Sequence, residues 1–146
     1  MRLLSLLLCC MLLYSAPSAP DLAQVRAEPN LEKRSRAALD LAERSLKASR
    51  QAYAAGEMQQ AATDLDEMEQ CVDLAETSLE GTGKNPIKSP KHFKYAEIKT
   101  VDLLRKIEAY LQDTSVPDRP MVEHAKEKVQ EVHDRLLHGI MTGKKR

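Results

Sequence analysis

The segment Gly81-Thr82-Gly83-Lys84 is the first candidate for chemistry, because it resembles the end of a phosphate-binding loop. The complete motif needs a glycine five positions before Gly83 and a serine or threonine directly after the lysine. Ser78 and Asn85 occupy those two positions. An amphipathic helical pattern also precedes the segment, where the motif requires a strand. The sequence therefore does not predict a nucleotide-binding loop.

Histidine spacing argues against a single metal site. His124, His133 and His138 all fall in the last predicted helix, but steps of nine and five residues place them on different sides of it. His92 has no carboxylate or cysteine close in sequence, and no Cys-x-x-Cys-His haem-attachment motif is present. We therefore expect solvated histidines and predict no bound metal.

A haem site and an acid–base catalytic site are two further alternatives. A non-covalent haem between Met58 or Met68 and a histidine of the last helix is one alternative, since helical bundles build cofactor sites from facing helices. Methionine at such positions more often fills a core. Acidic pairs such as Glu69 and Asp73 lie one turn apart, without an apolar cleft to raise one pKa for general acid catalysis. The expectation is a protein with no cofactor and no enzymatic activity.

Charge is distributed unevenly along the chain, although the formal net charge is zero. The segment 57–80 contains no Lys or Arg and many acidic residues, all of which lie off its apolar stripe. It therefore predicts a helix with an acidic outer surface. The acidic residues chosen as a possible interaction surface are Asp66, Glu69, Asp73 and Glu76.

A loop rich in lysine follows this acidic segment. No acidic residue interrupts the series, which consists of Lys84, Lys88, Lys91 and Lys94. Simple solvation is the plainest interpretation. Alternatives are attraction to the acidic helix, within one chain or between chains, and docking to an anionic envelope lipid or an acidic polysaccharide. A net charge of zero gives no global field that would attract nucleic acid.

Composition and periodicity together predict an all-α protein. Aromatic residues make up 3% of the chain, whereas strands are enriched in them. Apolar residues recur in steps of three and four from Leu39 to Tyr53 and from Met58 to Leu79, with Gly56 between the two stripes. These stripes predict a long helical hairpin. Helices near 90–112 and 120–138 would complete an antiparallel four-helix bundle over residues 30–139, and the wide apolar face of the third helix predicts that it is the most buried.

The remaining segments predict export. Residues 1–18 have the charge, apolar run and small-residue ending of a signal peptide, and the apolar run is shorter than the roughly 20 residues that span a bilayer. Residues 19–29 are interpreted as a flexible arm and residues 140–146 as a basic tail. Cleavage after Ser18 would leave Cys71 as the sole cysteine, a half-buried hydrophobic residue or a thiol available for pairing between chains.

A short resemblance concerns the predicted turn. Tyr53, Gly56 and Ala61 resemble the turn between the two helices of a tetratricopeptide repeat. That repeat is 34 residues long, whereas this hairpin is longer and no second copy is present, so the family is not assigned. The sequence thus predicts an exported, periplasmic or secreted helical protein with a binding or structural role. A haem-carrying bundle and a helical-repeat-like interaction module are the alternatives.

Overall fold

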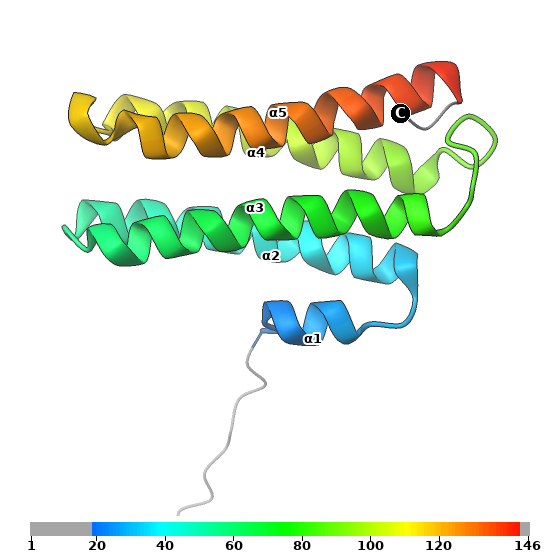
Figure 1. The fold of residues 1–146 in the computed structure, drawn as a ribbon, viewed down its shortest axis with the longest axis horizontal. Coiled ribbons are helices and arrows are strands. Elements are labelled where there is room, and N and C mark those ends of the chain that lie inside the picture. Colours follow the sequence, from blue (N-terminus) through cyan, green and yellow to red (C-terminus); the bar gives the residue numbers. More distant parts are fainter. Residues whose placement is uncertain (1–18, 144–146) are drawn as a thin grey trace, which may run out of the picture.

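A computed structural model describes residues 19–143, and every regular element in that part of the chain is a helix (Figure 1). The predicted all-α class is therefore confirmed. The predicted signal peptide, residues 1–18, and the last three basic residues lie outside the described residues. The helices are α1 (Leu22–Ala27), α2 (Leu31–Ala54), α3 (Met58–Gly81), α4 (Lys91–Asp113) and α5 (Arg119–Thr142), with a short 3-10 helix, η1 (Val116–Asp118), between the last two.

Helices α2 and α3 lie side by side and carry the two predicted stripes (Figure 1). The Asn30 side chain caps α2 by accepting a hydrogen bond from the backbone N–H of Lys33 at 2.9 Å. Gly56 closes the turn with φ of +79°, a conformation that glycine adopts without strain. The stripe residues from Leu39 to Ser49 and from Ala61 to Leu79 are buried, whereas Met58 is 38% exposed at the start of α3. Periodicity thus located this pair of helices correctly.

Helices α4 and α5 form the second pair of neighbours, and the buried residues of both pairs join in one core. The prediction that the helix near 90–112 is the most buried is wrong. Ile98 is 64% exposed and Val101 is 47% exposed. The reason is that α2, α3 and α5 cover only the inner side of α4, and no described element lies over its outer side.

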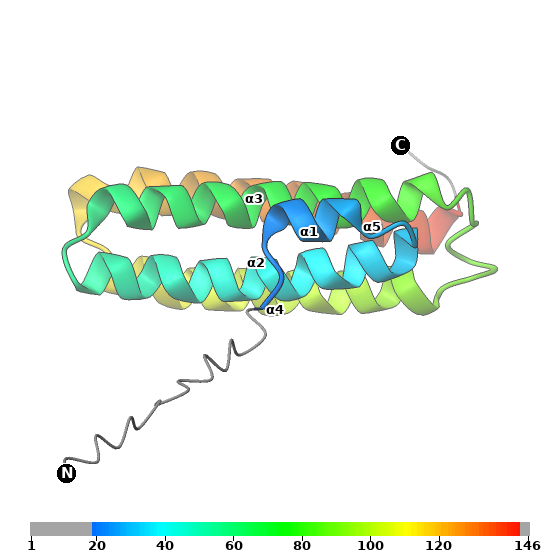
Figure 2. The same cartoon turned by 90° about the horizontal axis from the view of Figure 1, so that it is seen from below.

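The segment predicted as a flexible arm instead contains α1, which lies across α2 and α3 on the side away from α4 and α5 (Figure 2). Asp21 and Gln24 form a capping box, with hydrogen bonds of 2.9 and 3.1 Å between side chain and backbone. Val25 is 2% exposed and anchors the helix to the core. Apolar periodicity cannot reveal a helix of six residues with one buried side chain. Helix α5 also continues to Thr142, into the segment predicted as a tail.

Candidate binding surfaces

The acidic residues of α3 do not form the unbroken exterior that the sequence predicted. The Lys128 ammonium lies 3.1 Å from the Asp73 carboxylate, and His124 Nδ1 lies 3.5 Å from Glu69 Oε1. Burial raises the pKa of Glu69 above its ordinary value. Both carboxylates flank the buried stripe on the side of α5, and the side chain of Glu69 is 17% exposed while that of Asp73 is 42% exposed. Of the acidic residues chosen as a possible interaction surface, Asp66 is exposed.

Glu76 makes the most buried contact of this kind. Arg135 donates from Nε to Oε1 at 2.7 Å and from Nη2 to Oε2 at 2.6 Å, so that both carboxylate oxygens are engaged. The hydrogen bond to Glu76 raises the pKa of Arg135. Glu76 is 6% exposed and cannot serve as a docking residue. The α3 carboxylates therefore help to hold α5 against α3.

The lysines predicted to lie in a loop are exposed at one end of the molecule, and two of them, Lys91 and Lys94, belong to the first turn of α4 rather than to a loop. We call Lys84, Lys88, Lys91 and Lys94 the lysine end. Lys84 Nζ lies 2.6 Å from Glu32 Oε1, so its ion pair is with α2 and not with an acid of α3. The hydrogen bond from Lys84 holds the pKa of Glu32 below its ordinary value.

The other three lysines of this group have exposed side chains. Among the described residues, neither Lys88 nor Lys94 lies within ion-pair distance of an acid, and Lys91 acts on Glu32 only at longer range. Lys84, Lys91 and Lys94 border one shallow depression, so most of the predicted cluster is brought together in space. Three of its four charges are left available.

The loop that presents the lysines is held in place by Asn85. Its Oδ1 accepts hydrogen bonds from the backbone N–H groups of Ile87 and Lys88 at 2.8 and 3.2 Å, which forms an Asx turn. Its Nδ2 donates to the carbonyl of Gly143 at 3.3 Å, at the end of α5. The lysine end is therefore a defined surface built on α4, α5 and this turn.

A second surface, which the sequence reasoning missed, lies on α5. A shallow depression of about 500 Å³ is bordered by residues of which most are acidic or polar: Glu123, Lys126, Glu127, Gln130, Glu131 and Asp134. We call it the acidic groove. The signal was present in the sequence as acids three and four residues apart on one side of the predicted helix, opposite its buried stripe.

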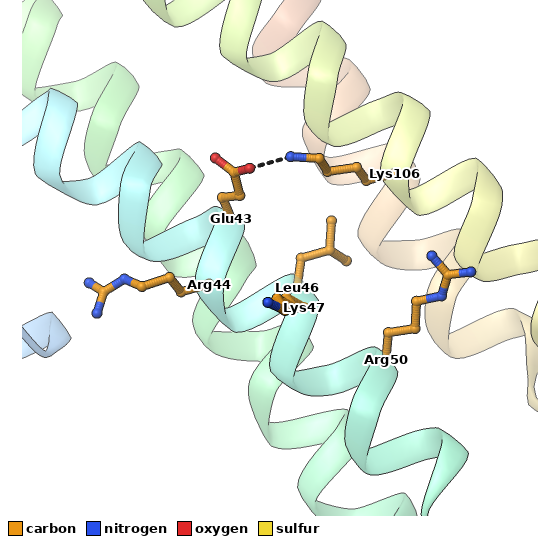
Figure 3. A pocket seen from close by; sticks show the side chains of 6 residues that line it. All are labelled: Glu43, Arg44, Leu46, Lys47, Arg50 and Lys106. Carbon is orange, nitrogen blue, oxygen red and sulfur yellow. Dashed lines mark hydrogen bonds and ion pairs between the residues drawn. The ribbon is translucent and has the colours of Figure 1, made fainter. Parts of the chain in front are cut away.

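A third feature is a groove between α2 and α4, with a volume of about 380 Å³ (Figure 3). Lys106 donates to Glu43 across it, and Lys99 approaches Glu43 at 3.1 Å. These hydrogen bonds, that of Lys106 foremost, lower the pKa of Glu43. The cations around the groove are Arg44, Lys47, Arg50 and Lys106, with Leu46 at its base. A small anionic molecule is the chemistry that this lining suits.

The residues considered for a cofactor are scattered in the fold. Met68 is fully buried in the core, whereas Met58 is partly exposed at the start of α3. His133 Nδ1 lies 3.1 Å from the Thr100 hydroxyl. No group of three potential metal-ligating side chains occurs within residues 19–143. Within the same range, none of the helices is both long enough and apolar enough to cross a bilayer.

Comparison with known proteins does not add a relative. No protein family matches the chain, and neither the curated proteins nor the solved structures include a significant match to it.

Proposed function

We propose that this chain is an exported protein, periplasmic or secreted, with a binding or structural role and no catalytic one. In this proposal the four long helices form an antiparallel bundle that acts as a rigid support for the lysine end. The lysine end contacts a negatively charged surface of a partner. The observation that carries the proposal is the exposure of Lys88, Lys91 and Lys94 without close acidic partners.

Several other charged groups are already paired between neighbouring helices. Asp73 and Glu76 on α3 are paired with α5, and Glu43 on α2 is paired with Lys99 and Lys106 on α4. Such contacts link neighbouring helices and leave these groups little capacity to bind a partner. Lysines held in solvent, in contrast, each contribute about 1 kcal/mol of favourable binding free energy when an anionic surface approaches.

Heparin is a suitable probe for this proposal, because it is a soluble polyanion with no apolar surface to bind. Lys88→Glu and Lys94→Glu should each weaken heparin binding by about fivefold at low salt, as follows from about 1 kcal/mol per lysine. Lys47→Glu is the matched control, since Lys47 is also an exposed lysine without an ion pair in the described part of the chain. Equal affinity of wild type, both variants and the control would remove the proposal.

Export is tested separately from binding. The predicted cut after Ser18 leaves every described residue in the mature chain, including Pro20, whose carbonyl accepts a hydrogen bond from Arg44 at 2.9 Å. Expression of the full chain in a bacterial host should therefore yield, outside the cytoplasm, a protein whose first residue is Ala19. The mass of the recovered protein, measured by mass spectrometry, identifies its first residue. A product that retains the first eighteen residues in the cytoplasm would contradict it.

The groove between α2 and α4 supports a second candidate, the binding of a small anionic ligand. Its specific observation is that Lys47 lines this groove beside Leu46 without an ion pair in the described part of the chain, whereas Arg50 is paired with Asp113 and Lys106 with Glu43 (Figure 3). Lys47→Glu should then weaken binding of such a ligand while Lys88→Glu leaves it unchanged, which is the reverse of the result expected for heparin at the lysine end.

A further inference from the structure

The outer face of α4 and α5 combines three kinds of residue. Lys91, Lys94, Ile98 and Val101 follow one another in steps of three and four, so they share the side of α4 opposite its buried residues. On α5 the same side carries the acidic groove and Leu137, which is 38% exposed. The α1 helix covers part of the corresponding outer face of α2 and α3 (Figure 1), whereas no described element covers this one.

Contacts between the two helices fix how these residues lie along the face. The Thr100 hydroxyl meets His133 Nδ1 at 3.1 Å, and Lys126 Nζ lies 2.6 Å from Glu108 Oε2. Helix α5 therefore runs back along α4, and Leu137, one turn beyond His133, borders the same seam as Val101. The face is thus basic at one end and mainly acidic towards the other, where Arg105 is 79% exposed but paired with Asp102, and Lys126 is paired with Glu108. Between these ends lies an apolar patch, which consists of Ile98, Val101 and Leu137.

We propose that this face binds the same face of a second copy of the chain. The inference rests on the proposed function, because it names the partner that the lysine end contacts: the acidic groove of the other copy. A two-fold axis makes one patch meet itself, so the patch must be complementary to itself. A face with a basic end, an apolar middle and an acidic end meets this requirement when the two copies run in opposite directions.

The dimensions of the helices allow the contact. When the two copies of α4 cross at Ile98 and Val101, Lys91 and Lys94 lie about 10 Å from the crossing point, at about 1.5 Å per residue. A crossing angle of about 50°, which is common between packed helices, carries these lysines from α4 towards the neighbouring α5 of the other copy. There the side chains reach Glu127 and its neighbours in the acidic groove. The symmetry forms the contact twice.

A second copy fits this face better than an anionic bilayer does. Glu123, Glu127 and Asp134 are exposed on the same face as the lysines, and an anionic lipid surface would repel them. The acidic groove of another copy attracts the lysines, and the exposed isoleucine and valine are buried at the crossing. A formal net charge of zero also removes the general repulsion that keeps charged proteins apart.

The experiment measures the size of the mature full chain by light scattering over a range of protein and salt concentrations. The dimer should form at high protein concentration and low salt, and should weaken as salt screens the charges. The variant Lys91→Glu/Lys94→Glu and the variant Glu123→Lys/Glu127→Lys should each raise the dissociation constant by about thirtyfold, because each removes several charge pairs across the interface. Lys33→Glu/Lys47→Glu, with the same change in net charge on α2, should dimerise like the wild type.

Mixing the two charge-reversed variants gives the decisive result. One variant is acidic at both ends of the face and the other is basic at both ends, so together they should form a heterodimer more tightly than either forms a homodimer. A wild type that stays monomeric at low salt, or variants that dimerise like the wild type, overturns the inference. If the chain is monomeric but binds heparin through Lys88 and Lys94, the proposed function stands without a second copy. If it neither dimerises nor binds heparin, both fail.

Discussion

Arg135 on α5 donates hydrogen bonds from Nε and Nη2 to the two carboxylate oxygens of Glu76 on α3, at 2.7 and 2.6 Å. Glu76 is almost fully buried. This ion pair joins the two pairs of helices at a point that the sequence marked as an acidic exterior. Because the charge on Glu76 is removed from water, loss of its partner strongly lowers the free energy of unfolding. Loss of an exposed ion pair changes that free energy little.

We predict that Arg135→Ala lowers the free energy of unfolding by about 2–3 kcal/mol, since it leaves the Glu76 carboxylate buried and unpaired. Arg135 itself is partly exposed, which keeps the loss towards the low end of the range for buried pairs. Urea denaturation measures the change. Lys126→Ala, which removes the exposed pair with Glu108, is the control and should cost less than about 1 kcal/mol. Equal decreases in the free energy of unfolding for the two variants would contradict a larger contribution from the buried pair.

A second prediction concerns the buried hydroxyl of Tyr110. It lies 3.1 Å from the Ser49 hydroxyl, which itself donates to the Ala61 carbonyl at 2.7 Å, so α4 is linked to the α2 and α3 pair. Burial raises the pKa of Tyr110. Tyr110→Phe should therefore lower the free energy of unfolding by about 1 kcal/mol.

The control for this change is Tyr95→Phe. The Tyr95 hydroxyl is more exposed and makes only a long hydrogen bond of 3.4 Å to Asp40. Its removal should change stability by a few tenths of a kcal/mol at most. Thermal or urea unfolding of both variants would contradict the account if Tyr95→Phe proved the more damaging.

A third prediction is a loss of stability at alkaline pH that depends on Cys71. Burial raises the pKa of this thiol to about 12 from an ordinary value of 9.0. Between these values the unfolded chain releases a proton that the folded chain retains. The contribution to stability is therefore complete below pH 9.0 and decreases by about 1.4 kcal/mol per pH unit as the pH rises towards 12.

Urea denaturation of wild type and Cys71→Ala on both sides of pH 9.0 isolates this effect. The variant keeps the other titrating groups, so its stability should fall less steeply with pH than that of the wild type. Parallel pH profiles for the two proteins would mean that the thiol titrates alike in the folded and unfolded chains.

A fourth prediction is that α1 protects Cys71 from reagents. Arg26 of α1 donates to Gln70, the residue before Cys71, at 3.0 Å, and Val25 is buried in the same core cluster as the thiol. Val25→Asp should detach α1 and raise the rate of alkylation of Cys71 by about tenfold or more, because less of the structure must open. Val116→Asp makes the same change at an exposed position and should leave the rate unchanged. Equal rates in the two variants would contradict a protective role of α1.

Periodicity in the sequence was sufficient for the long helices and their buried stripes. Leu39 to Ser49 and Ala61 to Leu79 could be predicted because each step of three or four residues returns to one side of a helix. Asn30 and Gly56 could be predicted because a cap and a left-handed turn have specific residue preferences. The lysine cluster was predicted because its members are close in sequence.

The misses have a common physical cause, which is that a single helix does not reveal what lies beside it. Glu76 was assigned to solvent because it lies off the stripe, but α5 covers the edge of that stripe and supplies Arg135. Ile98 and Val101 belong to the wide apolar face from which the most buried helix was predicted, but no described element covers them. The sequence did not show that the acidic groove on α5 and the lysines of α4 lie on the same face, because this depends on how the two helices pack.

The central claim is that the lysine end is the surface through which this protein binds. The most direct test is an amide chemical-shift map of the isotope-labelled mature chain as a short heparin oligosaccharide is added. The account predicts that the largest shifts fall on residues 84–94 and weaken as salt is added. Shifts centred on Lys47 and Arg50, in the groove between α2 and α4, or no shifts at low salt, would contradict it.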